Sequence, residues 1–93
     1  MTYRLLVSDD LRDFIRHLPP VLKKKIRVVL KEIVNDPSCG KALVEELAGL
    51  YSYKIGRIRV IYQVMRDSIT LIAVGPRKTV YQKAALEIKR RPR

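Results

Sequence analysis

The sequence predicts an α+β domain in which an N-terminal helical hairpin packs on a small, mostly antiparallel sheet, in the order β-α-α-β-β-β-α. Two patterns predict this class. Apolar residues recur at three- and four-residue steps before residue 37, and the period changes to two after Gly49. A chain of 93 residues has room for one domain with one core, so we expect residues 1–93 to form a single domain.

The first part of the chain predicts a short strand and two helices. Residues 3–7 favour a strand, and Ser8 suits the cap of a helix that ends before Pro19-Pro20. The second helix begins at this proline pair, because proline is tolerated in a first helical turn, and it ends at the turn signal Asn35-Asp36-Pro37. Its apolar residues lie at helical spacing: Leu22, Ile26, Val29, Leu30 and Ile33.

The second part of the chain predicts a three-stranded meander. The strands are expected at residues 51–55, 58–65 and 68–74. Gly56-Arg57 and Arg66-Asp67 suit the two tight turns that join them.

The segments on either side of the meander have different signals. Gly75-Pro76 is expected to break the last strand, and residues 79–90 suit a C-terminal helix. Residues 37–49 have a weaker pattern, which is typical of a turn or a short loop helix.

Basic residues are concentrated in the second half of the chain. Twenty Lys+Arg against nine Asp+Glu give a net charge of +11, of which residues 47–93 carry +9. Charge of one sign steers an oppositely charged partner, so we expect this half to bind a polyanion, with RNA as the first choice. An anionic membrane surface fits less well, because the C-terminal basic run lacks a broad apolar face with anchoring aromatic residues.

Histidine and cysteine are too few for the common metal and thiol sites. His17 and Cys39 are the only residues of their kinds, and the carboxylates show no ligand spacing, so we expect no metal and no cofactor. A lone cysteine suits a reducing compartment. We find neither a signal peptide nor an apolar run of about 20 residues, and we therefore expect a soluble protein of the cytoplasm.

Cationic and phenolic side chains are the remaining candidates for chemistry. Lys54, Arg57 and Arg59 flank one tight turn, and Arg77 follows the end of the last strand. Arginines there can clamp phosphate oxygens with two hydrogen bonds, and Tyr81 can stack on a base or donate a proton. The alternative is that these charges are solvated residues at strand edges, where charge discourages aggregation.

Two segments resemble toxins of the RelE/ParE superfamily. Residues 50–64 (LYSYKIGRIRVIYQV) are similar to the central hairpin of these toxins. Residues 74–81 (VGPRKTVY) resemble the signature that closes their last strand. The order of the elements also matches, so the resemblance covers nearly the whole chain.

The resemblance implies toxin–antitoxin biology. RelE-like members cut mRNA on the ribosome without a metal ion, by driving the 2′-hydroxyl onto the adjacent phosphate. ParE-like members share the fold and inhibit DNA gyrase. Our first expectation is therefore a RelE-like endoribonuclease, and the alternatives are a gyrase inhibitor or a basic nucleic-acid-binding protein without catalysis. The implied partners are the ribosome with its mRNA and an acidic, partly disordered antitoxin that forms a hetero-oligomer with the toxin.

The resemblance also implies roles for individual residues. Lys54 matches the lysine that activates the 2′-hydroxyl, and Arg59 matches the arginine that stabilises the phosphate. Arg77 matches the arginine that assists the leaving 5′-oxygen, and Tyr81 matches the tyrosine that orients the substrate. The chain departs from the pattern at Gly56, where the family has a second lysine. The basic residues expected to bind RNA beside this set are Arg57, Lys78 and Lys83.

Overall fold

The computed structural model describes residues 3–90 and confirms the predicted α+β class. The helices are α1 (Asp9–Arg16), α2 (Pro20–Asn35) and α3 (Arg77–Arg90). The strands are β1 (Arg4–Leu6), β2 (Lys41–Ala42), β3 (Leu50–Ile55), β4 (Ile58–Val64) and β5 (Ser68–Pro76). They form one sheet in the order β1-β5-β4-β3-β2, in which only β1 and β5 pair in parallel among the described strands.

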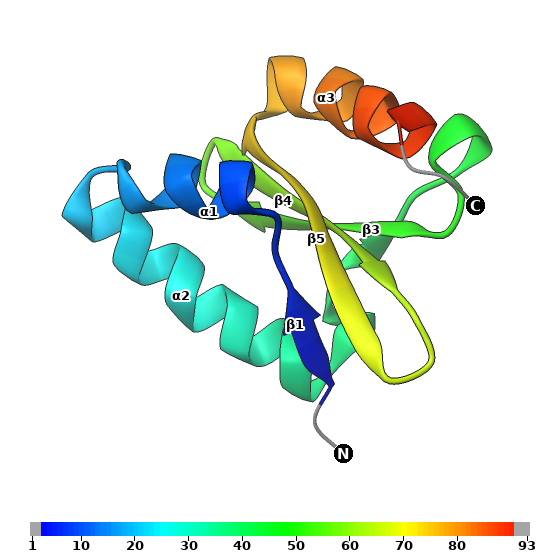
Figure 1. Ribbon diagram of the computed structural model, residues 1–93, viewed down its shortest axis with the longest axis horizontal. Coiled ribbons are helices and arrows are strands. Elements are labelled where there is room, and N and C mark those ends of the chain that lie inside the picture. The colour runs from blue at the N-terminus through cyan, green and yellow to red at the C-terminus, as the bar shows by residue number, and fades with distance from the viewer. Residues whose placement is uncertain (1–2, 91–93) are drawn as a thin grey trace.

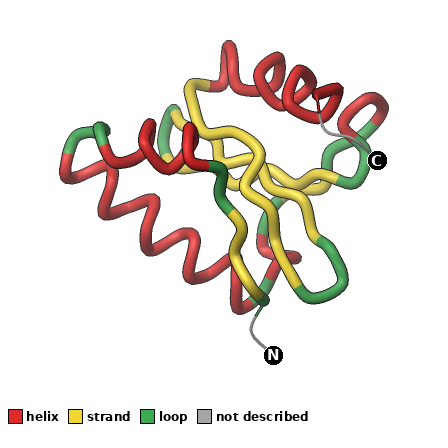
Figure 2. The backbone as a smooth tube through the Cα atoms, viewed as in Figure 1, coloured by secondary structure: helices red, strands yellow, loops and turns green. Residues whose placement is uncertain are grey.

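Three layers make up the fold, with the sheet in the middle. Figure 1 shows α1 and α2 on one side of the sheet and α3 on the other. Figure 2 shows, in green, the loops and turns between the helices and strands. Alternation along β4 explains how one strand serves both layers, since neighbouring residues point to opposite faces. Val60 and Tyr62 are buried with residues of α2, whereas Ile61 is buried with residues of α3. This is the alternation that the sequence predicts for β4.

Capping and proline define the helical hairpin as the sequence predicts. The Ser8 hydroxyl accepts a hydrogen bond from the Leu11 N–H at 3.2 Å, which satisfies one of the free donors at the start of α1. Helix α1 ends at Arg16, before the proline pair, and α2 begins at Pro20. Ile26 and Ile33 of α2 are fully buried, so this helix supplies much of the core on its side of the sheet.

The prediction that Gly75-Pro76 breaks the last strand is wrong. Strand β5 continues to Pro76, which pairs with Ile58, and α3 begins at the next residue, Arg77. Proline is tolerated at the end of a strand, because the ladder can stop where the missing N–H would be needed. The Arg77 N–H then donates to the Arg57 carbonyl at 3.3 Å, which joins the start of α3 to the hairpin turn.

Residues 37–49 contain a two-residue strand, β2, that the sequence did not predict. Two short 3₁₀ helices at Pro37–Cys39 and Glu45–Leu47 flank it. The buried Tyr62 hydroxyl holds this segment to the sheet: it donates to the Pro37 carbonyl at 2.6 Å and accepts from the Gly40 N–H at 3.0 Å. A Cβ at position 40 would collide with that hydroxyl, so Gly40 is required by the close approach of the backbone.

Candidate active site

The hairpin between β3 and β4 gathers cations at one end of the sheet. Lys54 on β3 and Arg59 on β4 are paired across the hairpin, and Arg59 is also paired with Gly75 on β5. Paired residues of antiparallel strands project to the same face. Since Arg59 alternates with Val60 and shares its face with Ile61, Lys54 and Arg59 lie on the face that α3 covers.

The turn of this hairpin holds the Arg59 guanidinium. Gly56 has a φ of +58°, in the left-handed region that glycine adopts without a steric penalty. Nη1 of Arg59 donates to the Gly56 carbonyl at 3.1 Å and to the Ile58 carbonyl at 3.2 Å. Arg59 is half-buried, and these two bonds fix its guanidinium against the turn. A cation held in this way needs little reorganisation to meet a phosphate.

The start of α3 brings two more of the predicted residues to the same end of the sheet. Arg77 is the first residue of α3, and its N–H donates to the carbonyl of Arg57 in the hairpin turn. Tyr81 lies one turn further along, with its hydroxyl 3.4 Å from the Ser52 hydroxyl. Ser52 precedes Lys54 by two residues and therefore lies on the same face of β3. The structure thus brings Lys54, Arg59, Arg77 and Tyr81 together.

Ser52 is a candidate functional residue that the sequence analysis missed. It is buried, and its contact with Tyr81 is the one hydrogen bond that ties the tyrosine to the sheet among the contacts of the described residues. The alternation of β3 already places it on the face of Lys54, but nothing in the sequence indicates that the last helix crosses this part of the sheet.

The three basic residues expected to bind RNA beside this set separate into two places. Arg57 lies in the hairpin turn, and Lys78 is exposed beside Arg77 at the start of α3. Lys83 instead points away from Tyr81, because residues two apart in a helix face nearly opposite directions. Its ammonium lies 5.5 Å from the centre of the Phe14 ring, within reach of a cation–π interaction with α1.

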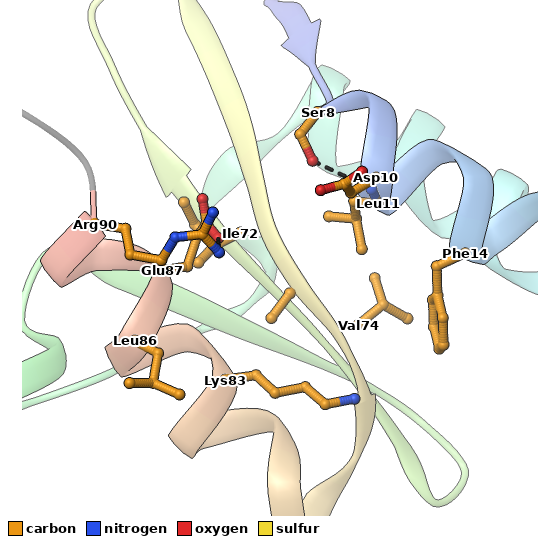
Figure 3. A pocket seen from close by; sticks show the side chains of 11 residues that line it. Ser8, Asp10, Leu11, Phe14, Ile72, Val74, Lys83, Leu86, Glu87 and Arg90 are labelled. Atoms are coloured by element: carbon orange, nitrogen blue, oxygen red, sulfur yellow. Dashed lines mark hydrogen bonds and ion pairs between the residues drawn. The ribbon is translucent and has the colours of Figure 1, made fainter.

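Lys83 belongs to a groove of about 420 Å³ between α1 and α3. Figure 3 shows its side chain extending across this groove towards Phe14, below the buried residues of β5. The groove is lined from α3 by Leu86, Glu87 and Arg90 as well, and it contains none of the four residues that gather at the hairpin.

Carboxylates border the candidate site on one side. Glu45 and Glu46 line a small depression together with Tyr81 and Gln82. Positive charge at the hairpin therefore gives way to negative charge beyond Tyr81. An anionic strand that crosses this face is attracted by Lys54, Arg57 and Arg77 and repelled past Tyr81.

The sequence contains one histidine, His17, and one cysteine, Cys39, which were considered above for metal and thiol chemistry. His17 is the C-cap residue that follows α1, and its Nδ1 lies 2.8 Å from the Asp13 carbonyl oxygen. Partial burial raises the pKa of the Cys39 thiol. Within residues 3–90, no three His, Cys, Asp or Glu side chains gather where they can hold a metal ion. No helix in that same range has the length and apolar character needed to cross a membrane.

Comparison with known sequences identifies one family. The family described as "ParE toxin of type II toxin-antitoxin system, parDE" matches residues 2–81. Among curated proteins, no sequence matches this chain.

Comparison with solved structures finds the same fold in RelE toxins. Free RelE of E. coli, in a form with two arginines replaced by alanine, has a TM-score of 0.78 and 22% identity, covering 95% of this chain and 99% of RelE. The toxin–antitoxin complex RelBE2 from Mycobacterium tuberculosis has a TM-score of 0.71 and 23% identity, covering 83% of this chain and 100% of the matched chain. The archaeal RelE–RelB complex from Pyrococcus horikoshii has a TM-score of 0.67 and 22% identity, covering 83% of this chain and 97% of the matched chain.

Proposed function

The chain belongs to the ParE toxin family of type II toxin–antitoxin systems, within the RelE/ParE superfamily, and we propose that it is an endoribonuclease that cleaves mRNA on the ribosome without a metal ion. The observation that carries this proposal is the clustering of Lys54, Arg59 and Tyr81 on one face of the sheet, with Arg77 beside them. A protein that only binds another protein has no need of this particular set.

In the proposed reaction, the 2′-hydroxyl attacks the adjacent phosphorus and the 5′-oxygen leaves. Lys54 acts here as the neutral amine: its lone pair accepts the proton of the 2′-hydroxyl, and the side chain becomes an ammonium. The guanidinium of Arg59 donates hydrogen bonds to the phosphate oxygens, on which negative charge grows in the transition state. Arg77 donates to the leaving 5′-oxygen, which then takes a proton from solvent, and the products are a 2′,3′-cyclic phosphate and a 5′-hydroxyl.

Tyr81 has a positioning role in this proposal. Its ring is half-buried against the core between the sheet and α3, and its hydroxyl contacts Ser52. A base that stacks on this ring is held beside Lys54 and Arg59, which aligns the 2′-hydroxyl of its nucleotide with the phosphate.

Inhibition of DNA gyrase is the second candidate function, and the family match favours it. The matching family is described as the ParE toxin, whereas the solved structures of similar fold are RelE toxins. One experiment separates the two candidates: the purified protein is incubated with ribosomes that carry an mRNA and, in parallel, with gyrase and plasmid DNA. We expect new mRNA ends and unchanged supercoiling. Loss of supercoiling with intact mRNA contradicts the ribonuclease proposal.

We further propose that the protein acts in the cytoplasm and is held inactive by an antitoxin. Several solved structures of similar fold are complexes with RelB antitoxins. The net charge of +11 favours an acidic partner. Co-expression with the product of the adjacent gene tests this proposal, and a harmless protein that forms no complex with that product contradicts it.

A further inference from the structure

A small depression adjoins Tyr81 of the candidate site. It lies between α3 and the 3₁₀ helix at Glu45–Leu47 and has a volume of about 300 Å³. Figure 1 shows this short helix, in green, beside α3. We call the hollow the Tyr81 depression. Besides Tyr81 itself, its lining residues are Val44, Glu45, Glu46, Leu47, Gln82 and Ala85.

The lining of the Tyr81 depression combines apolar walls with a few hydrogen-bonding groups. Val44, Leu47 and Ala85 supply the apolar part, and Val44 is 72% exposed. Two carboxylates and one side-chain amide supply the polar part. This combination suits a small, flat ligand, because apolar walls pack on its faces while the polar groups read its edge. A phosphate fits poorly, since the carboxylates repel an anion. A protein segment normally covers a wider surface than this single hollow.

Tyr81 connects this depression with the proposed chemistry. Its hydroxyl lies 3.4 Å from the hydroxyl of the buried Ser52, and this contact holds the tyrosine against the sheet. Proteins that read single-stranded RNA commonly stack a base on an aromatic ring and bond to the edge of that same base. The Tyr81 depression offers both parts of such a site, a ring and a set of hydrogen-bonding groups next to it.

The carboxylates of Glu45 and Glu46 are available to the edge of a base. Both side chains are exposed, and within residues 3–90 neither carboxylate has an ion pair or a hydrogen bond to another residue, although the chain carries 20 Lys and Arg. A carboxylate only accepts hydrogen bonds. It therefore suits the amino groups of cytosine, adenine and guanine, whereas uracil presents carbonyl oxygens instead.

We propose that the Tyr81 depression receives the base that stacks on Tyr81 and selects bases with an exocyclic amino group over uracil. Glu45 and Glu46 accept hydrogen bonds from that amino group, and the Gln82 amide bonds to the remaining polar atoms of the edge. The selection rests on the proposed function, because the base belongs to the nucleotide whose 2′-hydroxyl attacks. The two carboxylates determine specificity and take no part in the bond-breaking steps.

The first test compares two messages on ribosomes that differ only in the base 5′ of the cut, which is cytosine in one and uracil in the other. These bases have the same size and differ at the edge that the carboxylates face. We expect kcat/KM to be about tenfold higher for the cytosine message, because a good contact to a base edge is worth about 1–3 kcal/mol.

A pair of matched double variants locates the selection. Glu45→Gln/Glu46→Gln keeps the shape of both side chains and adds amide donors that suit the uracil carbonyl, so the preference for cytosine should fall below about twofold or reverse. Asp9→Asn/Asp67→Asn removes the same charge at two exposed positions outside the depression and should keep the preference. Loss of acidic charge strengthens the binding of any RNA, so the ratio between the two messages is the readout.

Two results overturn this selection where the protein cleaves mRNA. Equal rates on the two messages mean that the carboxylates only border the path of the RNA. A cytosine preference that survives in Glu45→Gln/Glu46→Gln places the selection elsewhere. Both results leave the ribonuclease proposal intact.

A binding assay separates the two proposals if no message is cleaved. Fluorescence anisotropy compares a short labelled oligocytidine with an oligouridine of the same length. Tighter binding of oligocytidine by about tenfold, lost in Glu45→Gln/Glu46→Gln, supports the Tyr81 depression as a base site and leaves only the ribonuclease proposal refuted. Equal binding of the two oligonucleotides by a protein that cleaves nothing overturns both.

Discussion

Replacing Arg59 by alanine is expected to slow RNA cleavage by 10²- to 10³-fold, which corresponds to about 2.7–4 kcal/mol of transition-state stabilisation. This range applies to a donor that is already oriented before the reaction. Arg59 satisfies this condition, because it is half-buried and Nη1 bonds to the Gly56 and Ile58 carbonyls at 3.1 and 3.2 Å. The fold should tolerate the change: the two lost hydrogen bonds lie at a turn that water reaches, so the free energy of unfolding should fall by only about 1 kcal/mol.

The assay measures single-turnover cleavage of an mRNA on ribosomes, with urea unfolding of each variant as the control for stability. Arg66→Ala is the matched control, because Arg66 is an exposed arginine in the turn between β4 and β5, at the opposite end of β4 from Arg59. Arg59→Lys should recover only part of the rate, since lysine keeps the charge but not the planar fork. Equal losses in Arg59→Ala and Arg66→Ala, or none in either, refute a transition-state role for Arg59.

Three further predictions concern the framework that holds the site. Tyr62→Phe leaves the Pro37 carbonyl and the Gly40 N–H unpaired, so urea unfolding should show a loss of about 1–3 kcal/mol; a loss below about 0.5 kcal/mol contradicts the role of this hydroxyl. Burial raises the pKa of Tyr62 in the folded state. The stability that the neutral Tyr62 hydroxyl contributes is therefore complete below pH 10 and is lost as the pH rises further. At alkaline pH the free energy of unfolding should therefore fall more steeply with pH in the wild type than in Tyr62→Phe. Equal slopes in the two proteins contradict this prediction. Gly56→Lys, which restores the second lysine of the family, should reduce stability by about 1–2 kcal/mol because φ is +58° there; an unchanged thermal midpoint is the opposing result.

Local patterns were sufficient to predict most of the fold. Residues such as Ile26 and Ile33 repeat at helical spacing, and Val60 and Tyr62 alternate with Ile61, so each element carries its own period. The cations at the hairpin were predictable for the same reason, since a two-residue turn fixes which residues of β3 and β4 are paired. The roles proposed for them came from resemblance to a family and stay predictions.

Features that depend on contacts distant in sequence were not predictable. Strand β2 exists because Tyr62 holds residues 37–40 against the sheet, across more than twenty residues. A bulge in the pairing of β4 with β5 places both Ile72 and Ala73 on the side of α3, which simple alternation does not give. The contact of Lys83 with Phe14 of α1 depends on how α1 and α3 pack, which the sequence does not indicate.

The chemistry of the cut ends tests the central claim most directly. The protein is dialysed against excess chelator, mixed with ribosomes translating a defined mRNA, and the new 3′ ends are characterised. A reaction driven by the 2′-hydroxyl predicts 2′,3′-cyclic phosphate or 3′-phosphate ends, at a rate that the dialysis does not change, and few such ends with the Arg59→Ala/Arg77→Ala double variant. New 3′-hydroxyl ends, or full activity of the double variant, contradict the account.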